Sequence, residues 1–374
     1  MTCVRLMHHL VESVFRRRND PSQSAEARAN LIRILDTTVA KFRIVKPQVK
    51  LLLDNAKKAE ALENAAAKSA RESSAAATGA ALALPAPGRG EPRANAAAKR
   101  DEDAKDKGAA EDSEKKDADE SEKDASIIVG YGGATQTPAE ALKRLADTKA
   151  LVKTLVIGMK TLLWSVSNFH SGSQQMGAQP PVKGFREGEL RRASGFVANG
   201  VRCLALYQGT ECAEMCTHFA EALAVLDPRN FLDVVCLRLD ALLGGGEPYE
   251  LAPMVQLPHL LLQSTALGRS FADALATHLV RDRLSALADP ASPQSQLVLK
   301  LFSLLMHAVS KYSSCEAVLS PHIVPLVETC LKAMKEVEDP SAYVRLLRYL
   351  FRACLLYTSP SPRDQRGSRM PSSA

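Results

Sequence analysis

Four side chains in the middle of the sequence are of the types that bind zinc. They are Cys203, Cys212, Cys216 and His218, and the four-residue spacing of Cys212 and Cys216 places these two on one face of a helix. A structural zinc site usually takes paired cysteines from a tight turn and a second pair of ligands downstream. Here the cysteines lie within GTECAEMCTHFAEAL, an amphipathic helical pattern with large apolar residues. The sequence therefore favours buried thiols. A metal site would be supported only if metal analysis found stoichiometric zinc.

Other side chains that could support catalysis are not arranged in a known motif. The histidines considered are His170, His259, His278, His307 and His322, and no G-x-S-x-G, H-E-x-x-H or G-x-x-x-x-G-K-[ST] motif occurs. Two glycine-rich segments, YGGATQTPAE and LLGGGEPYE, do not follow a credible strand, and the second is typical of a turn after a helix. We therefore expect no catalytic, cofactor-binding or metal-ligating residue, no cofactor, no small-molecule substrate and no enzymatic activity.

Composition and the N-terminus narrow the class of protein. The chain has 374 residues, 46% hydrophobic but only 5% aromatic, which favours helices rich in Ala and Leu over a β-sandwich. Its eight cysteines lie mostly in apolar runs, as reduced thiols inside a cell do. The first 20 residues do not resemble a secretory signal, and Lys153 and Lys160 interrupt the best candidate for a membrane span. His8-His9 and Arg16 to Arg18 are interpreted as a solvated helix end.

A compositional break separates two parts of the chain. Residues 56–126 are first Ala-rich and then strongly charged, and the segment 98–124 has 12 acidic and 7 basic residues, a net charge of −5. Because the whole chain carries +6, the remainder carries +11. We expect a disordered insert, since the segment offers too little apolar surface to offset its ordering entropy. Its role is open between an acidic interaction tail and a tolerated loop insertion, and the scattered basic residues favour a solvated face over a nucleic-acid site.

Outside the insert, apolar residues recur with helical periodicity. Five probable helix starts place a capping side chain before proline: Thr137-Pro138 with Glu140, Asp227-Pro228, Asp289-Pro290, Ser320-Pro321 and Asp339-Pro340. The only strand candidate, SIIVGYGG, is too short to build a sheet. The pattern predicts helices near 3–17, 25–53, 138–168, 187–207, 211–225, 229–243, 250–263, 269–286, 294–311, 321–337 and 341–353.

These helices predict an all-α fold. Antiparallel pairs about 40 residues apart, joined by short loops, are typical of a HEAT/armadillo-like α-solenoid, although periodicity alone leaves an irregular bundle open. The predicted organisation is a helical segment at 1–55, the insert at 56–126, a second helical segment at 127–353 and a disordered terminus at 354–374.

Three stretches resemble a known family. They are LADTKALVKTLVIGMKTLLWSVSNF, FAEALAVLDPRNFLDVV and the long block from LVLKLFSLLMHAV to LLRYLFRA, and upstream ARANLIRILDTTVAKFRIVKPQVKLLL adds to them. In order and rough spacing they resemble the N-terminal helical-repeat region of the transformation/transcription domain-associated protein family, the pseudokinase branch of the phosphatidylinositol-3-kinase-related kinases. The resemblance covers most of residues 1–353 outside the insert and the loop HSGSQQMGAQPPVKGFREG.

The resemblance implies a function without catalysis. It implies a nuclear scaffold segment of a transcription coactivator in SAGA-type and MYST-type histone acetyltransferase complexes, which contacts complex subunits and transcription activators. It implies protein partners, no direct sequence-specific nucleic acid and no membrane, and it carries over no site residue. The alternative is a helical-repeat nuclear transport or trafficking adaptor.

The last 21 residues, Cys354 to Ala374, differ from the helix before them. CLLYTSPSPRD, with SRMPSSA after it, resembles translated adaptor sequence, a recurrent artefact at the ends of assembled transcripts. A natural disordered terminus and a Ser-Pro phosphorylation site at Ser359 and Ser361 are the alternatives. We therefore expect this segment to contribute nothing to the fold.

Overall fold

The protein is helical wherever its structure is described. The computed structural model describes residues 2–20, 22–80, 137–169, 188–244 and 247–358, and every regular element in these ranges is a helix, which confirms the all-α prediction. The α-helices are α1 Thr2–Arg16, α2 Ser24–Val45, α3 Val49–Ala80, α5 Pro138–Ser167, α6 Ser194–Cys203, α7 Gly209–Ala224, α8 Pro228–Val234, α9 Leu239–Leu243, α10 Leu251–Gln263, α11 Gly268–His278, α12 Pro293–Lys311, α13 Ser320–Ala333 and α14 Ser341–Thr358.

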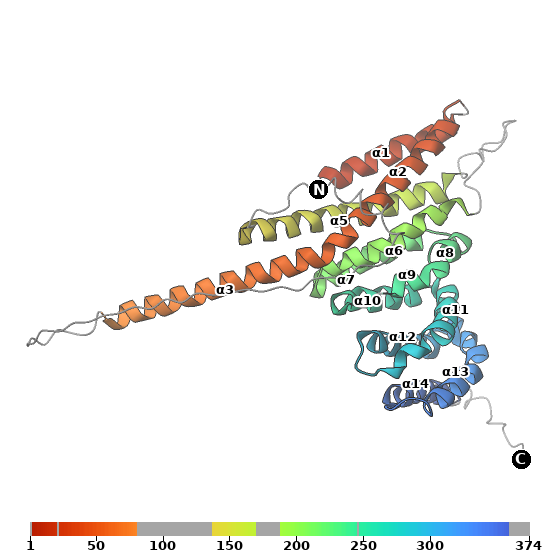
Figure 1. Ribbon diagram of the computed structural model, residues 1–374. Helices are drawn as coiled ribbons and strands as arrows, with labels where there is room; N and C mark the ends of the chain where they lie inside the picture. The colour runs from red at the N-terminus through yellow and green to blue at the C-terminus, as the bar shows by residue number, and fades with distance from the viewer. Residues whose placement is uncertain (1, 21, 81–136, 170–187, 245–246, 359–374) are drawn as a thin grey trace, which may run out of the picture. The chain divides into compact units, whose positions relative to one another are not determined.

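The helices form two compact units. The first comprises residues 1–53 and those from Lys143 onward, and the second comprises Asp54–Leu142. In the first unit α1 packs on α2 and α2 on α6, while α7, α10, α12 and α14 pack in succession (Figure 1). Each helix thus contacts near neighbours rather than one common centre, as in an α-solenoid.

One hydrophobic core runs through the first unit from Val11 to Ala353. Aromatic rings connect helices in it: Phe196 lies with its ring centroid 5.2 Å from that of Phe42 and stacks at 4.1 Å on Phe219. Gly200 permits this approach, because a Cβ at that position would lie 2.8 Å from a Phe219 ring carbon. Each fully buried ring contributes about 1.5–3 kcal/mol relative to an exposed one.

Two predicted helix starts form with their capping side chains in place. The Thr137 Oγ1 accepts from the Glu140 backbone N–H at 3.4 Å, and a Glu140 carboxylate oxygen accepts from the Thr137 N–H at 3.2 Å. Before α8, the Asp227 carboxylate accepts from two backbone N–H groups, at 2.9 and 3.0 Å. The Asp339 carboxylate likewise accepts from the Ser341 N–H at 2.9 Å, while α14 begins at Ser341, one residue after Pro340.

The other two starts were wrong in detail. Asp289 caps a turn through the Ala291 N–H, and α12 begins at Pro293 with the Ser292 hydroxyl as its cap. Asp289-Pro290 and Ser292-Pro293 both place a capping residue before proline, and this pattern alone does not distinguish which of the two begins the helix. Ser320 is already helical and makes no capping bond, since Leu319 occupies the N-cap position of α13.

Four predicted helices are interrupted. The helix predicted at 25–53 divides into α2 and α3 at a 3-10 segment, Lys46–Gln48, and the one predicted at 187–207 contains α6 between two 3-10 segments. The helix predicted at 229–243 divides into α8 and α9, and the one at 269–286 passes through a π-helical turn at Leu279–Arg283. At two of these breaks the chain is buried through consecutive residues, Leu204 to Leu206 and Val234-Val235.

Two predicted boundaries were also wrong. The helix predicted to end at residue 53 continues as α3 to Ala80, because residues 54–80 are dominated by the strong helix formers Ala, Lys and Glu. The last helix continues five residues beyond Ala353 to Thr358. The rest of the predicted insert, SIIVGYGG and residues 359–374 lie outside the described residues.

Helix α5 is long and apolar enough to cross a membrane by length and composition alone. Half of its most apolar window is nevertheless buried inside the protein. Val152, Val156 and Met159 belong to the core, and Lys153 and Lys160 bind glutamates of α7. We therefore describe α5 as a core helix of the solenoid.

Candidate functional site

Helix α7 carries most of the residues that the zinc hypothesis named. Cys212 and Cys216 lie on its buried face, as the spacing predicted, and Cys203 is buried at the end of α6, where its thiol donates to the Phe42 carbonyl at 3.7 Å. His218 lies about half a turn away on the partly exposed face and contacts glutamates instead. The four side chains therefore do not converge, and no group of three His, Cys, Asp or Glu residues in the described ranges could hold a metal ion.

The buried thiols are poorly suited to act as ligands or nucleophiles. Burial raises the pKa of Cys203 and of Cys236 to about 12, and that of Cys330 to about 11. The hydrogen bond between Cys212 and Cys216 lowers the pKa of Cys212, whereas it raises the pKa of Cys216, and burial raises the latter further. Four of these five thiols are therefore held in the protonated form. Because the thiolate is the reactive and metal-binding form, these groups act as small apolar core side chains at neutral pH.

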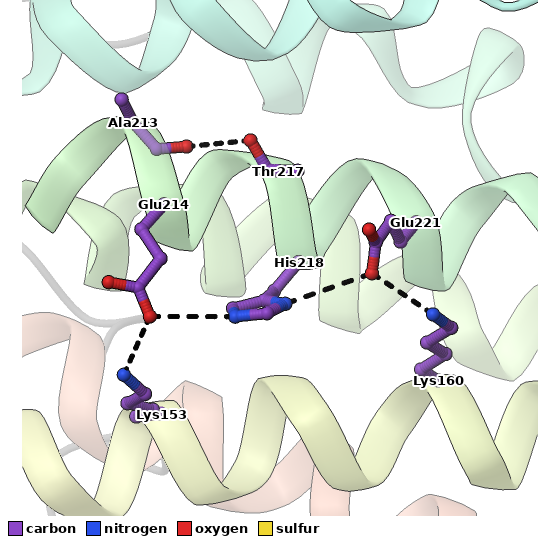
Figure 2. Close-up of polar contacts among 7 residues, drawn as sticks. All are labelled: Lys153, Lys160, Ala213, Glu214, Thr217, His218 and Glu221. Carbon is purple, nitrogen blue, oxygen red and sulfur yellow. Dashed lines mark hydrogen bonds and ion pairs between the residues drawn. The ribbon is translucent and has the colours of Figure 1, made fainter. Parts of the chain in front are cut away.

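The exposed side of α7 is joined to α5 by ion pairs, a set that we name the α5–α7 ladder (Figure 2). Lys153 binds Glu214 at 2.8 Å and Lys160 binds Glu221 at 3.0 Å, measured from Nζ to a carboxylate oxygen. The His218 ring lies between these carboxylates, with its Nε2 at 3.6 Å from Glu214 and its Nδ1 at 3.7 Å from Glu221. A further pair, Lys149 with Glu211 at 3.0 Å, extends the ladder and does not appear in Figure 2.

The ladder lowers the pKa of two of its glutamates. The hydrogen bond from Lys153 lowers the pKa of Glu214, and the hydrogen bond from Lys160 lowers that of Glu221. Sequence reasoning missed the ladder, although a signal was present. Lys149, Lys153 and Lys160 lie on one face of α5, and the glutamates of α7 are similarly aligned.

A cavity of about 210 Å³ lies at one end of the ladder. Its lining includes the two ion pairs Lys149–Glu211 and Lys153–Glu214, together with Tyr207 and Met215. The Tyr207 hydroxyl donates to the Lys149 carbonyl, and burial raises its pKa. Since the charged groups around this cavity neutralise one another, they provide no net charge to recognise an ionic ligand.

The other histidines named from the sequence are scattered. His259 bonds Gln263 at 2.8 Å, His322 lies 4.0 Å from Asp273, His307 is exposed, and His170 lies outside the described residues. They do not form a shared site.

His278 is held in one protonation state. Its Nδ1 bonds Asp282 at 3.0 Å, and its Nε2 accepts from the Arg283 Nε at 3.3 Å, so the neutral ring carries its proton on Nδ1. Burial lowers the pKa of this ring. The network connects α11 to the π-helical turn and is a structural feature of the fold.

The basic N-terminal cluster ends a helix. Arg16 binds Glu12 at 2.6 Å, Arg18 lies over the Phe15 ring at 3.7 Å, and His8 and His9 are exposed on α1. Of the two glycine-rich segments, the first lies largely outside the described residues, and Gly244 of the second follows the end of α9. These placements do not assemble a binding site.

Comparison with known proteins gives one consistent family. The family model described as Tra1 HEAT repeat central region matches residues 1–356, so the family is the one that the sequence resembles, but the matched repeats are described as central and not as N-terminal. The chain is 26% identical over 235 residues to a transformation/transcription domain-associated protein from Danio rerio and 25% identical over 232 residues to one from Homo sapiens. Each alignment covers 56% of this chain and 6% of the relative, so the chain spans a small fraction of the length of these relatives.

Proposed function

The chain belongs to the Tra1 HEAT repeat central region family, and from that membership we propose that it is a non-catalytic scaffold segment of a transcription coactivator. Its role is to contact subunits of SAGA-type and MYST-type histone acetyltransferase complexes and transcription activators in the nucleus. The observation that carries the proposal is the family match, which extends over nearly the whole helical array. The relatives' name, which refers to transcription, supports the same assignment.

The chemistry of the described residues supports a role in binding. The thiols considered as ligands are buried, the cavity beside α5 is lined by mutually neutralised charges, and His278 is engaged in a structural network. What remains is an extended helical surface, and helical arrays of this kind use such surfaces to bind other proteins. We propose that the segment has no catalytic, cofactor-binding or metal-ligating residue.

The charge distribution also supports protein partners over nucleic acid. Lysines of the α5–α7 ladder are paired with glutamates, and Arg192 binds Asp36 at 2.7 Å. Phosphate binding along a backbone needs many unpaired cations gathered on one face, and the three exposed arginines of α14 lie next to the exposed apolar side chains of Val344 and Phe351. We therefore propose no direct sequence-specific nucleic-acid contact and no membrane association.

Affinity capture tests the proposed function. The tagged full chain is incubated with nuclear extract, and the bound proteins are identified by mass spectrometry and assayed for histone acetylation. We expect acetyltransferase subunits and acetylation activity in the eluate. The control is Leu223→Asp, which places a charge in the core and should unfold the protein.

The proteins captured decide between the two function classes. Subunits that bind the folded chain and not the Leu223→Asp variant support the coactivator scaffold. Recovery of a Ran-type GTPase or of coat proteins in their place would instead support a transport or trafficking adaptor. Equal capture of all proteins by both forms would show adhesion to exposed core residues and would refute recruitment by a folded surface.

A further inference from the structure

Helix α11 ends in a π-helical turn, and the side chains of His278 and Arg283 meet across it. The turn comprises Leu279–Arg283 and follows His278, the last residue of α11. The Arg283 Nε donates to the His278 Nε2 at 3.3 Å. In a regular α-helix, side chains five residues apart point about 140° away from each other, because each residue rotates by about 100°. The wider π-helical turn brings positions five apart to the same side, so the side-chain bond and the turn support each other.

The Nε2 atom can accept this bond only while the ring is neutral. The His278 residue is 8% exposed, and its Nδ1 bonds the Asp282 carboxylate at 3.0 Å. Since the Nδ1–H donates to that carboxylate, the lone pair of Nε2 is free to accept from Arg283. A proton on Nε2 would turn it into a donor that faces another donor, and it would place two cations side by side.

The charged groups around the ring oppose one another. Asp282 and Arg283 belong to the turn itself, and Asp240 belongs to α9. Burial is the largest cause of the lowered pKa of His278; the hydrogen bond from Asp282 and the charges of both aspartates raise it, and the charge of Arg283 lowers it. The two carboxylates therefore favour a charged ring, whereas burial and Arg283 disfavour it. The direction of the pKa shift shows that the second pair prevails.

The segment after the π-helical turn contacts the helices that follow it. This 3-10 segment, Leu284–Ala288, packs against α12, α13 and α14. The Leu284 carbonyl accepts from the buried Tyr343 hydroxyl of α14 at 3.1 Å, and Leu287 lies in the core. A change of spacing in the turn would rotate this segment and disturb its contacts with all three helices.

We propose that His278 and Arg283 form an acid-sensitive latch that holds the π-helical turn. While the ring is neutral, Nε2 binds Arg283 and the turn keeps its five-residue spacing. When Nε2 takes a proton from water, Arg283 is released and the turn relaxes toward α-helical spacing. The segment Leu284–Ala288 then loosens its contacts with the following helices. The latch goes beyond the proposed function, because it controls the conformation of the array whichever partner the array binds.

The sign of the pH dependence follows from the two states of the turn. The closed turn favours the neutral ring, whereas a ring in the open turn has the ordinary pKa of 6.5. The latch is therefore closed above pH 6.5 and weakens as pH falls below that value through the lowered folded pKa. At about pH 5.5 the open ring is about tenfold more often protonated than neutral, so opening is favoured by up to about tenfold.

Hydrogen exchange of the full chain tests the latch. Exchange is followed by mass spectrometry at about pH 7.5 and about pH 5.5, and each rate is divided by the intrinsic rate at that pH. We expect the protection of the amides of residues 279–287 to fall by about three- to tenfold at the lower pH. The amides of α2, a helix without histidine, should change by less than about twofold. Equal protection of residues 279–287 at both pH values would overturn the proposal.

Two variants distinguish a latch from an ordinary buried histidine. His278→Gln keeps an oxygen that accepts from Arg283 but takes no proton in this range, so residues 279–287 should stay protected at both pH values. Arg283→Met removes the donor, so protection should already be low at about pH 7.5 and should change by less than about twofold with acid. The matched control is His259→Gln, which should respond as the wild type does because that ring bonds Gln263 within α10.

Thermal melting at about pH 7.5 checks that the variants fold. A full pH response in Arg283→Met would show that burial of the ring alone causes it, and a full response in His278→Gln would assign it to other titrating groups; either result refutes the latch. If a variant does not fold, the comparison between residues 279–287 and α2 in the wild type still decides, because it needs no substitution.

Discussion

Helices α7 and α14 are both amphipathic, but their outward charged groups have different environments. The glutamates of α7 meet lysines of α5 and enclose His218, so that face is neutralised within the solenoid. The arginines of α14 border exposed apolar residues, and no carboxylate lies on the same helix. A charged face that is already paired serves to hold two helices together. The exposed arginines of α14 have no such role among the described residues.

Removing one aromatic ring from each helix should separate these roles most strongly. Phe219 of α7 is fully buried and stacked on Phe196, so Phe219→Ala should lower the free energy of unfolding by about 3–5 kcal/mol. Phe351 of α14 is 55% exposed, and Phe351→Ala should change that free energy by no more than about 0.5 kcal/mol. Urea unfolding followed by circular dichroism measures both.

A similar loss in the free energy of unfolding for the two variants would contradict the distinction between α7 and α14. It would mean that the Phe351 ring supports the fold as the Phe219 ring does. Equal denaturant slopes in the two variants serve as the control, because they show that both unfold from the same native structure.

The next largest effect concerns the buried side of α7. Cys216→Ser places a hydroxyl in an apolar environment and should lower the free energy of unfolding by about 1–3 kcal/mol. The exposed Arg348→Ser on α14 should change it by less than about 0.5 kcal/mol. Differential scanning calorimetry, with and without a zinc chelator, measures both effects. A chelator-dependent fall in the Tm of the wild type would revive the zinc hypothesis.

Much of the fold could be predicted from the sequence, because helical periodicity indicates which face of each helix is buried. Spacing alone placed Cys212 and Cys216 inward, and the Thr137 and Asp227 caps form as predicted. The positions at which helices are interrupted could not be predicted in this way. The break after Val234 lies where α8 packs against α6 and α11, and a helical window in the sequence contains no information about these neighbours.

The candidate site could likewise be predicted only in part. His218 was considered because histidine can bind metal, but the local sequence does not show that it lies among the ion pairs between α5 and α7. The lysines that bind the flanking glutamates come from α5, about sixty positions earlier in the chain, and pair only once the two helices pack. The alignment of each set on its own helix could be read from the sequence, whereas the pairing of the two helices could not.

Acid should weaken the α5–α7 ladder and leave the contribution of the α14 arginines to stability unchanged. The folded pKa of Glu221 lies below its ordinary value of 4.5 because of Lys160, so its contribution to stability is present above pH 4.5 and is lost as pH falls through the lowered folded pKa. The same sign holds for Glu214 with Lys153. Urea midpoints between about pH 6 and pH 3 should therefore fall less steeply in Lys153→Met with Lys160→Met than in the wild type.

The matched control for that pH series is Arg348→Met. Helix α14 contains no carboxylate, so removing its arginine should leave the slope of the wild type unchanged. Other acids of the protein titrate equally in all three forms, and the difference between the curves isolates the ladder. Parallel curves for the wild type and the double lysine variant would show that the ion pairs contribute no pH-dependent stability.

The smallest effect is the coupling between Lys160 and Glu221, and it tests the comparison most directly. These side chains are 47% and 46% exposed, so a double-mutant cycle with Lys160→Met and Glu221→Gln should give a coupling of only about 0.2–1 kcal/mol. The coupling should diminish at about 1 M salt, where screening is strong. A parallel cycle with Arg348→Met and Glu328→Gln should give none, because these side chains form no ion pair in the part of the chain that the structure describes. Equal coupling in both cycles would mean that the arginines of α14 are already paired within the fold, and the distinction between the two helices would fail.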